Sequence, residues 1–160
     1  MKNNNTFCVL LLTLVLASTA TILNAQSILG SWKKTDEVLI KEDGIKKSTY
    51  KMMLKNMPCF QTIVYSFLAG GKMDETAKDC AAPVQKLVAG DLTNARWKIT
   101  GNKLIIDVAG KNALVKHAVY QIDFNSNNEM IWTFIYADNP GVPNATRAKQ
   151  MQTTYVRIGS

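Results

Sequence analysis

Residues 95–108 read ARWKITGNKLIIDV, and this stretch decides the fold class of the chain. In its first half, apolar and charged side chains alternate, which is the pattern of a β-strand that buries one face. Gly101-Asn102 then supplies a two-residue turn, and a second apolar segment follows it. The stretch therefore predicts an antiparallel hairpin.

The same pattern of short apolar segments and turn residues recurs along most of the chain. We expect strands within residues 27–40, 61–68, 72–76, 95–100, 104–108, 114–124, 130–137 and 152–158. Nearly all of them are joined by short connections, which favours sequential antiparallel neighbours. Eight such strands predict an all-β, up-and-down barrel with room for one small ligand. A two-sheet sandwich is the alternative.

Two longer connections interrupt this series. Residues 41–58, between the first two strands, carry apolar side chains near helical spacing and end at Pro58, so we expect a short helix or an ordered loop there. Residues 79–91 contain Pro83 and Gly90, and we expect them to form a loop.

The N-terminus has the features of an export signal. Lys2 precedes an uncharged apolar segment at residues 7–17, and the small Ala25 stands before Gln26. This order is typical of a secretory signal peptide. The apolar segment is shorter than the ~20 residues of a membrane-spanning helix, although an uncleaved anchor or a buried first helix is the alternative.

We therefore expect residues 1–25 to be a cleaved signal peptide and residues 26–160 to form one domain that begins at Gln26. That domain would be periplasmic or secreted, without stable insertion into a membrane. Its length suits a single hydrophobic core.

The charge pattern argues against nucleic acid as a partner. The chain has a formal net charge of +7, but its lysines and arginines are scattered and no aromatic residues interleave with them. A solvated basic face that aids solubility explains such a distribution. Gly70-Gly71 is not followed by the Lys-Ser/Thr pair of a phosphate-binding loop, and we expect no cofactor.

The three cysteines divide between the leader and the domain. Cys8 lies in the apolar segment, which leaves Cys59 and Cys80 in the exported part. An even pair in an exported domain predicts one disulfide. Metal binding and redox chemistry are the alternatives, but the spacing is not that of a Cys-x-x-Cys motif and one histidine does not complete a zinc site.

The sequence contains no recognisable catalytic constellation. His117 is the single histidine, and no nucleophile context surrounds it, so a structural or solvent-facing role is expected. The acidic side chains near the exit of the first strand fit neither a calcium loop nor a glycosidase pair and are expected to be solvated. They are Asp36, Glu37, Glu42 and Asp43. We therefore expect neither enzymatic activity nor a metal site.

Gly30-Ser31-Trp32, followed by a series of strands, resembles the Gly-x-Trp opening of the lipocalins. In that family, an arginine of the last strand packs over this tryptophan at the closed end of the barrel. Arg157 stands at the matching place in this chain. The resemblance therefore implies a structural contact between Trp32 and Arg157.

The whole domain resembles the lipocalin-like proteins that Bacteroidetes-type bacteria export. Those chains show a cysteine before a Tyr-x-Phe strand, a glycine turn and a second cysteine, followed by Trp-x-Ile and Asn-x-Leu strands. The matching residues are Cys59, Tyr65-Ser66-Phe67, Gly70-Gly71, Cys80, Trp97-Lys98-Ile99 and Asn102-Lys103-Leu104. The resemblance implies the fold more firmly than a function, since many members have no assigned activity.

If Trp32 points inward, the family pattern and strand alternation place a set of mainly aromatic residues on the inner face. They are Tyr65, Phe67, Trp97, Ile106, Tyr120, Ile122, Trp132, Phe134 and Tyr155. Such an interior predicts a pocket for a small hydrophobic molecule. The alternative is a barrel filled by its own side chains, which would act on a protein partner through the loops at residues 41–58 and 79–94.

Overall fold

The computed structural model describes residues 28–91, 94–109 and 115–159. The strands are β1 (Gly30–Lys41), β2 (Lys46–Ser48), β3 (Val64–Leu68), β4 (Lys72–Thr76), β5 (Arg96–Thr100), β6 (Lys103–Asp107), β7 (His117–Ser126), β8 (Glu129–Ile135) and β9 (Ala148–Ile158). The helices are α3 (Tyr50–Asn56) and α4 (Ala82–Asp91), with short 3-10 segments η1 (Pro58–Thr62), η2 (Ala69–Gly71) and η3 (Tyr136–Asp138). The expected signal peptide and the expected start at Gln26 lie outside the described residues.

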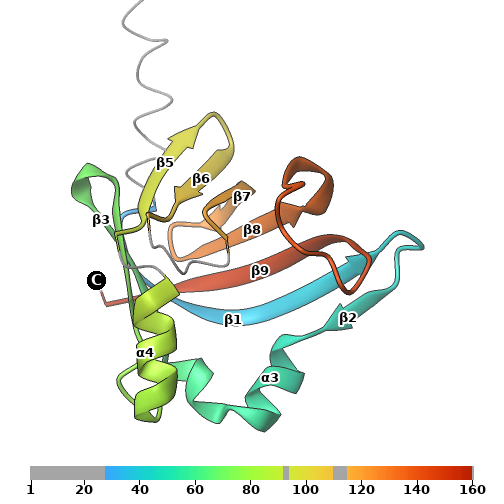
Figure 1. Cartoon of the computed structure of the whole chain (residues 1–160). Helices are drawn as coiled ribbons and strands as arrows, with labels where there is room; N and C mark the ends of the chain where they lie inside the picture. The colour runs from blue at the N-terminus through green and yellow to red at the C-terminus, as the bar shows by residue number, and fades with distance from the viewer. Residues whose placement is uncertain (1–27, 92–93, 110–114, 160) are drawn as a thin grey trace, which may run out of the picture.

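The strands form one antiparallel sheet that closes on itself (Figure 1). Each strand from β3 to β8 pairs with the next one in the chain, and β9 pairs with β1 along most of its length. Because β1 also pairs with β3, eight strands complete a lipocalin-like, up-and-down barrel. The predicted fold class is confirmed. The short strand β2 extends the sheet beside the second half of β1, and α3 follows it at the place where a short helix or ordered loop was expected.

The barrel is closed least tightly between β4 and β5. Only Lys72 and Arg96 form a register pair there. The indole N–H of Trp97 donates a hydrogen bond to the Lys72 carbonyl at 2.8 Å and so bridges the seam. Gly71 makes this approach possible, because a Cβ at this position would lie 2.7 Å from the Trp97 carbonyl oxygen.

One end of the barrel is packed solid around Trp32, which is fully buried. Its indole N–H donates a hydrogen bond to the Ile28 carbonyl at 2.8 Å. Arg157 lies over the indole ring and donates to the backbone carbonyls of Leu29 and Asn127. The contact that the lipocalin resemblance implies is therefore present in the structure.

A second, smaller core lies outside the barrel, beside β3 and β4. The predicted disulfide between Cys59 and Cys80 is confirmed and joins η1 to the turn before α4. Ile63 and Val88 are buried next to it. The expectation of a loop at residues 79–91 was wrong, because most of this segment is α4. Pro83 is compatible with that helix since it lies in the first turn, where a backbone N–H has no intrahelical partner.

Candidate functional site

The barrel encloses a cavity of about 340 Å³ between the packed end and the opposite, open end. Every barrel strand except β5 contributes to its wall. The lining residues are Lys34, Glu37, Tyr65, Met73, Glu75, Ile106, Val108, Val115, Ala118, Tyr120, Trp132, Met151, Thr153 and Tyr155. The interior is therefore not filled completely by its own side chains.

Five of the nine residues expected in the interior line this cavity, namely Tyr65, Ile106, Tyr120, Trp132 and Tyr155. The other four lie apart from it. Phe67, Trp97 and Ile122 belong to the packed core, and Phe134 is buried against Tyr120. Strand alternation identified the inward face correctly, but it does not tell where along the barrel axis packing ends and the cavity begins.

Aromatic rings form the floor of the cavity. The rings of Trp132 and Tyr155 lie 4.4 Å apart, and Tyr65 meets Tyr155 edge-on at 5.3 Å. Phe67 packs behind Trp132 with an interplanar angle of 81°. The Tyr65–Tyr155 and Phe67–Trp132 contacts are edge-to-face, and Trp132 and Tyr155 are tilted at 38°. Such contacts are favourable for aromatic rings, so each ring of the floor is supported by a neighbour.

Three tyrosine hydroxyls belong to this wall, and burial keeps them neutral. Burial raises the pKa of Tyr120 to about 12 and raises that of Tyr155 well above its ordinary value. Burial, reinforced by the neighbouring Glu75 carboxylate, also raises the pKa of Tyr65, whose hydroxyl is hydrogen-bonded to that carboxylate. The hydroxyls of Tyr120 and Tyr155 make no hydrogen bond to another described residue. They are therefore available to a polar group of a ligand.

Glu37 reaches the cavity because of an irregularity in β1. Lys34 is paired with Tyr155 and Asp36 with Thr154, so Thr35 is one extra residue in the ladder. An extra residue reverses the alternation that follows it. Lys34 and Glu37 both face inward as a result, and the expectation that Glu37 belongs to a solvated acidic group was wrong.

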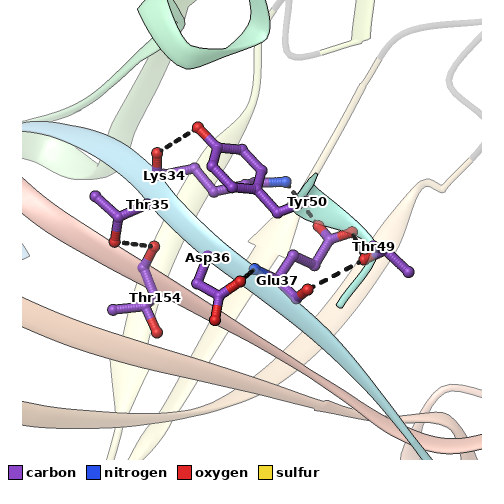
Figure 2. A network of polar contacts seen from close by, with 7 residues as sticks. All are labelled: Lys34, Thr35, Asp36, Glu37, Thr49, Tyr50 and Thr154. Atoms are coloured by element: carbon purple, nitrogen blue, oxygen red, sulfur yellow. Dashed lines mark hydrogen bonds and ion pairs between the residues drawn. The ribbon is translucent and has the colours of Figure 1, made fainter. Parts of the chain in front are cut away.

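Figure 2 shows how the inward side chains of β1 are tied to the segment after β2. The Lys34 ammonium donates to one Glu37 carboxylate oxygen at 2.7 Å, and the Thr49 hydroxyl donates to the other at 2.6 Å. The Tyr50 hydroxyl donates to the Lys34 carbonyl at 2.8 Å. Burial alone would raise the pKa of Glu37, but the Lys34 charge and the hydrogen bonds from Lys34 and Thr49 outweigh it and lower that pKa. The carboxylate is therefore ionised within the wall.

A second cavity of about 200 Å³ lies beside the first, between the barrel and its outer helices. Met53 of α3, Phe60 of η1 and Val88 of α4 contribute to it. Three residues line both cavities, namely Lys34, Tyr65 and Glu75. These three side chains lie between the barrel interior and the smaller core next to the disulfide.

Several lining residues escaped the sequence analysis. Lys34 and Thr153 are polar residues on strands that carry an inward aromatic residue, and Glu75 lies on β4, beside the strand of Tyr65. Their register relative to Tyr65 and Tyr155 could have indicated them, since Tyr65 pairs with Glu75 and Lys34 with Tyr155.

The catalytic and metal-binding candidates were considered separately from the cavity. His117 is exposed and 2.6 Å from an Asp107 carboxylate oxygen, away from the cavity. Within the part of the chain that the structure describes, no group of three or more potential metal ligands occurs. No helix among the described residues is long and apolar enough to span a membrane.

The cavity thus combines an apolar floor, neutral hydroxyls and one internal ion pair.

Comparison of the chain with protein-family models and with curated proteins finds no match.

Proposed function

We propose that the protein binds one small, mainly apolar molecule in the barrel cavity. The observation that carries this proposal is the cavity itself, because a barrel of this size is often filled by side chains. About 340 Å³ lies at the lower end of the range occupied by small-molecule sites. A compact ligand of roughly drug-fragment size fits this volume better than a long acyl chain.

The two sides of the cavity differ in chemistry, and this difference suggests how a ligand lies. The ion pair Lys34–Glu37 and Glu75 come from β1 and β4, and Tyr155 comes from neighbouring β9. The opposite strands, β6 to β8, supply mainly apolar side chains together with Tyr120. A ligand with one polar edge and an apolar body would match both sides.

Apolar burial sets the expected affinity. Burying roughly 300 Å² of ligand surface at ~25 cal/mol per Å² contributes about 7 kcal/mol before the costs of association. Hydrogen bonds from the tyrosine hydroxyls add selectivity more than affinity, because the ligand loses hydrogen bonds to water. This contribution alone corresponds to a dissociation constant in the micromolar range, so once the costs of association are subtracted, micromolar is the tightest affinity that we expect.

We further propose that the protein acts outside the cytoplasm. A disulfide such as Cys59–Cys80 is typical of an oxidising compartment. Together with the predicted signal peptide, it supports a periplasmic or secreted carrier related to exported lipocalin-like proteins.

N-terminal mass analysis of the exported protein should find Gln26 as the first residue, and a retained Met1 would contradict the proposed cleavage.

Intrinsic fluorescence gives a direct test, because one of the three tryptophans lines the cavity and the other two do not. The protein is titrated with compact sterols, retinoids, aromatic amines and fatty acids, and Trp132 emission should change on binding. The variant Trp132→Phe should lose this signal, whereas Trp97→Phe should keep it. If no compound changes the emission and native mass spectrometry of protein from its own host shows no bound molecule, the ligand-binding proposal fails in favour of an interaction module.

A further inference from the structure

The segment at residues 45–57, which we term the basic arm, has an unusual combination of exposed side chains. It comprises the end of the β1–β2 turn, β2, α3 and Met57. Large hydrophobic side chains that are strongly exposed are few among the described residues: Ile45, Met52, Met57 and Leu68. All except Leu68 lie in the basic arm. Scattered exposed apolar residues are normal, but their concentration in one short segment marks an interaction surface.

The charge of the basic arm is of one sign. Lys46, Lys47, Lys51 and Lys55 are exposed, and the arm contains no aspartate or glutamate. The acidic residues Glu42 and Asp43 precede the arm, in the β1–β2 turn. A short segment in which lysines alternate with exposed apolar side chains is typical of sequences that lie at the interface of an anionic bilayer, where the lysines meet lipid phosphates and the apolar groups enter the acyl boundary.

The position of the arm connects this surface to the interior of the protein. In the view of Figure 1, β2 and α3 lie below β1, on the side away from the β5–β6 hairpin. Met52 of α3 is exposed, whereas the adjacent Met53 lines the smaller cavity. The contact from Thr49 to Glu37 joins the beginning of α3 to the wall of the larger cavity. A surface that holds the arm would therefore lie next to both cavities.

We propose that the basic arm docks the protein on an anionic phospholipid bilayer. The lysines supply long-range attraction to the lipid phosphates, and Met52 and Met57 supply short-range apolar contact. The inference does not depend on the identity of the cavity ligand or on the presence of one. It predicts peripheral, salt-sensitive binding, because exposed charges are screened at high ionic strength.

Vesicle co-sedimentation tests the proposal. The protein, expressed with its own leader and purified from the soluble fraction, is mixed with vesicles of phosphatidylcholine alone or with phosphatidylglycerol added. The double variant Lys51→Gln/Lys55→Gln should bind the anionic vesicles roughly 25-fold more weakly, since each lysine near the surface contributes about fivefold. The double variant Lys98→Gln/Lys103→Gln removes the same charge from the exposed β5–β6 hairpin and should bind like the unaltered protein. The N-terminus is identical in all variants, so differences between them report on the arm.

The apolar side chains of the basic arm are tested with one further variant and a matched control variant. Met52→Gln should weaken binding to anionic vesicles, whereas Leu68→Gln, at an exposed position in the β3–η2 region, should not. Thermal unfolding of each variant verifies that the fold is kept. Equal loss in the arm and hairpin variants, or equal binding to neutral and anionic vesicles, would overturn the proposal. The proposal would also be overturned if the protein bound no vesicles but bound polyglutamate through Lys51 and Lys55. That result would assign the basic arm to an acidic protein partner.

Discussion

The guanidinium carbon of Arg157 lies 4.3 Å from the centre of the Trp32 indole ring, and this pair seals the packed end of the barrel. Trp32 belongs to the first barrel strand and Arg157 to the last, and the two are register partners. The contact therefore joins the two strands that complete the barrel. Gly30 leaves room for it, since a Cβ at this position would lie 2.7 Å from Arg157 Nη1.

Removal of the Trp32 indole should be among the most destabilising single changes in the protein. Trp32→Ala leaves a large cavity in a fully buried position, and we expect the free energy of unfolding to fall by about 3–5 kcal/mol. Urea denaturation measures this loss. Trp97→Ala, whose side chain is also buried but bridges the loosely paired seam, serves for comparison.

Arg157 should stabilise the folded protein through its planar shape as well as its charge. Arg157→Ala should cost about 1–3 kcal/mol, because it removes the stacking and the hydrogen bonds to two backbone carbonyls. Arg157→Lys keeps the charge but not the planar group, so it should recover only part of the loss. Full recovery by lysine would contradict a stacking role.

Glu37 should make stability depend on pH in a defined direction. Its folded-state pKa is lowered by Lys34 and Thr49, so its contribution is fully present above the unfolded-state pKa of about 4.3 and is lost as pH falls through the folded-state value. The difference in unfolding free energy between the protein and Glu37→Gln should therefore be larger at pH 7 than at pH 3. Glu42→Gln, at an exposed position, is the control and should differ little from the unaltered protein at either pH. A Glu37→Gln difference that stays constant with pH would contradict the ion pair.

Sequence patterning predicted the barrel and its inward face because alternation has a period of two residues in every strand. It placed Tyr65, Tyr120 and Trp132 inward, where they line the cavity. The same rule failed at Glu37, because the extra residue at Thr35 reverses alternation and nothing in the local sequence marks a bulge.

The helix α4 shows a different limit of local reasoning. Pro83 was read as a sign of a loop, although proline is also compatible with the first turn of a helix. The nearby disulfide and the burial of Val88 against Ile63 are long-range contacts that stabilise this helix in place. Local composition contains no information about those contacts.

Loss of the disulfide should destabilise this outer core more than the barrel. Cys59 and Cys80 are separated by 21 positions, and in the chain-entropy model a loop of this size contributes about 3 kcal/mol. Cys59→Ser/Cys80→Ser should therefore unfold at lower urea concentration. Hydrogen exchange should quicken most in α4 and η1, with β7 and β8 little changed. Equal acceleration across the whole chain would show that the disulfide stabilises the barrel as one cooperative unit with the outer core.

A substitution that fills the cavity should weaken ligand binding without lowering the free energy of unfolding. Ala118 is buried and lines the cavity, so Ala118→Leu adds apolar volume where space exists and should leave the free energy of unfolding unchanged or raised. Ala148 is equally buried but does not line the cavity, so Ala148→Leu should overpack and cost about 1–3 kcal/mol. Any compound that changes Trp132 emission should bind Ala118→Leu at least tenfold more weakly. Undiminished binding by this stable variant would place the ligand outside the barrel, and a strongly destabilised Ala118→Leu would show that the space beside β7 does not accept a side chain.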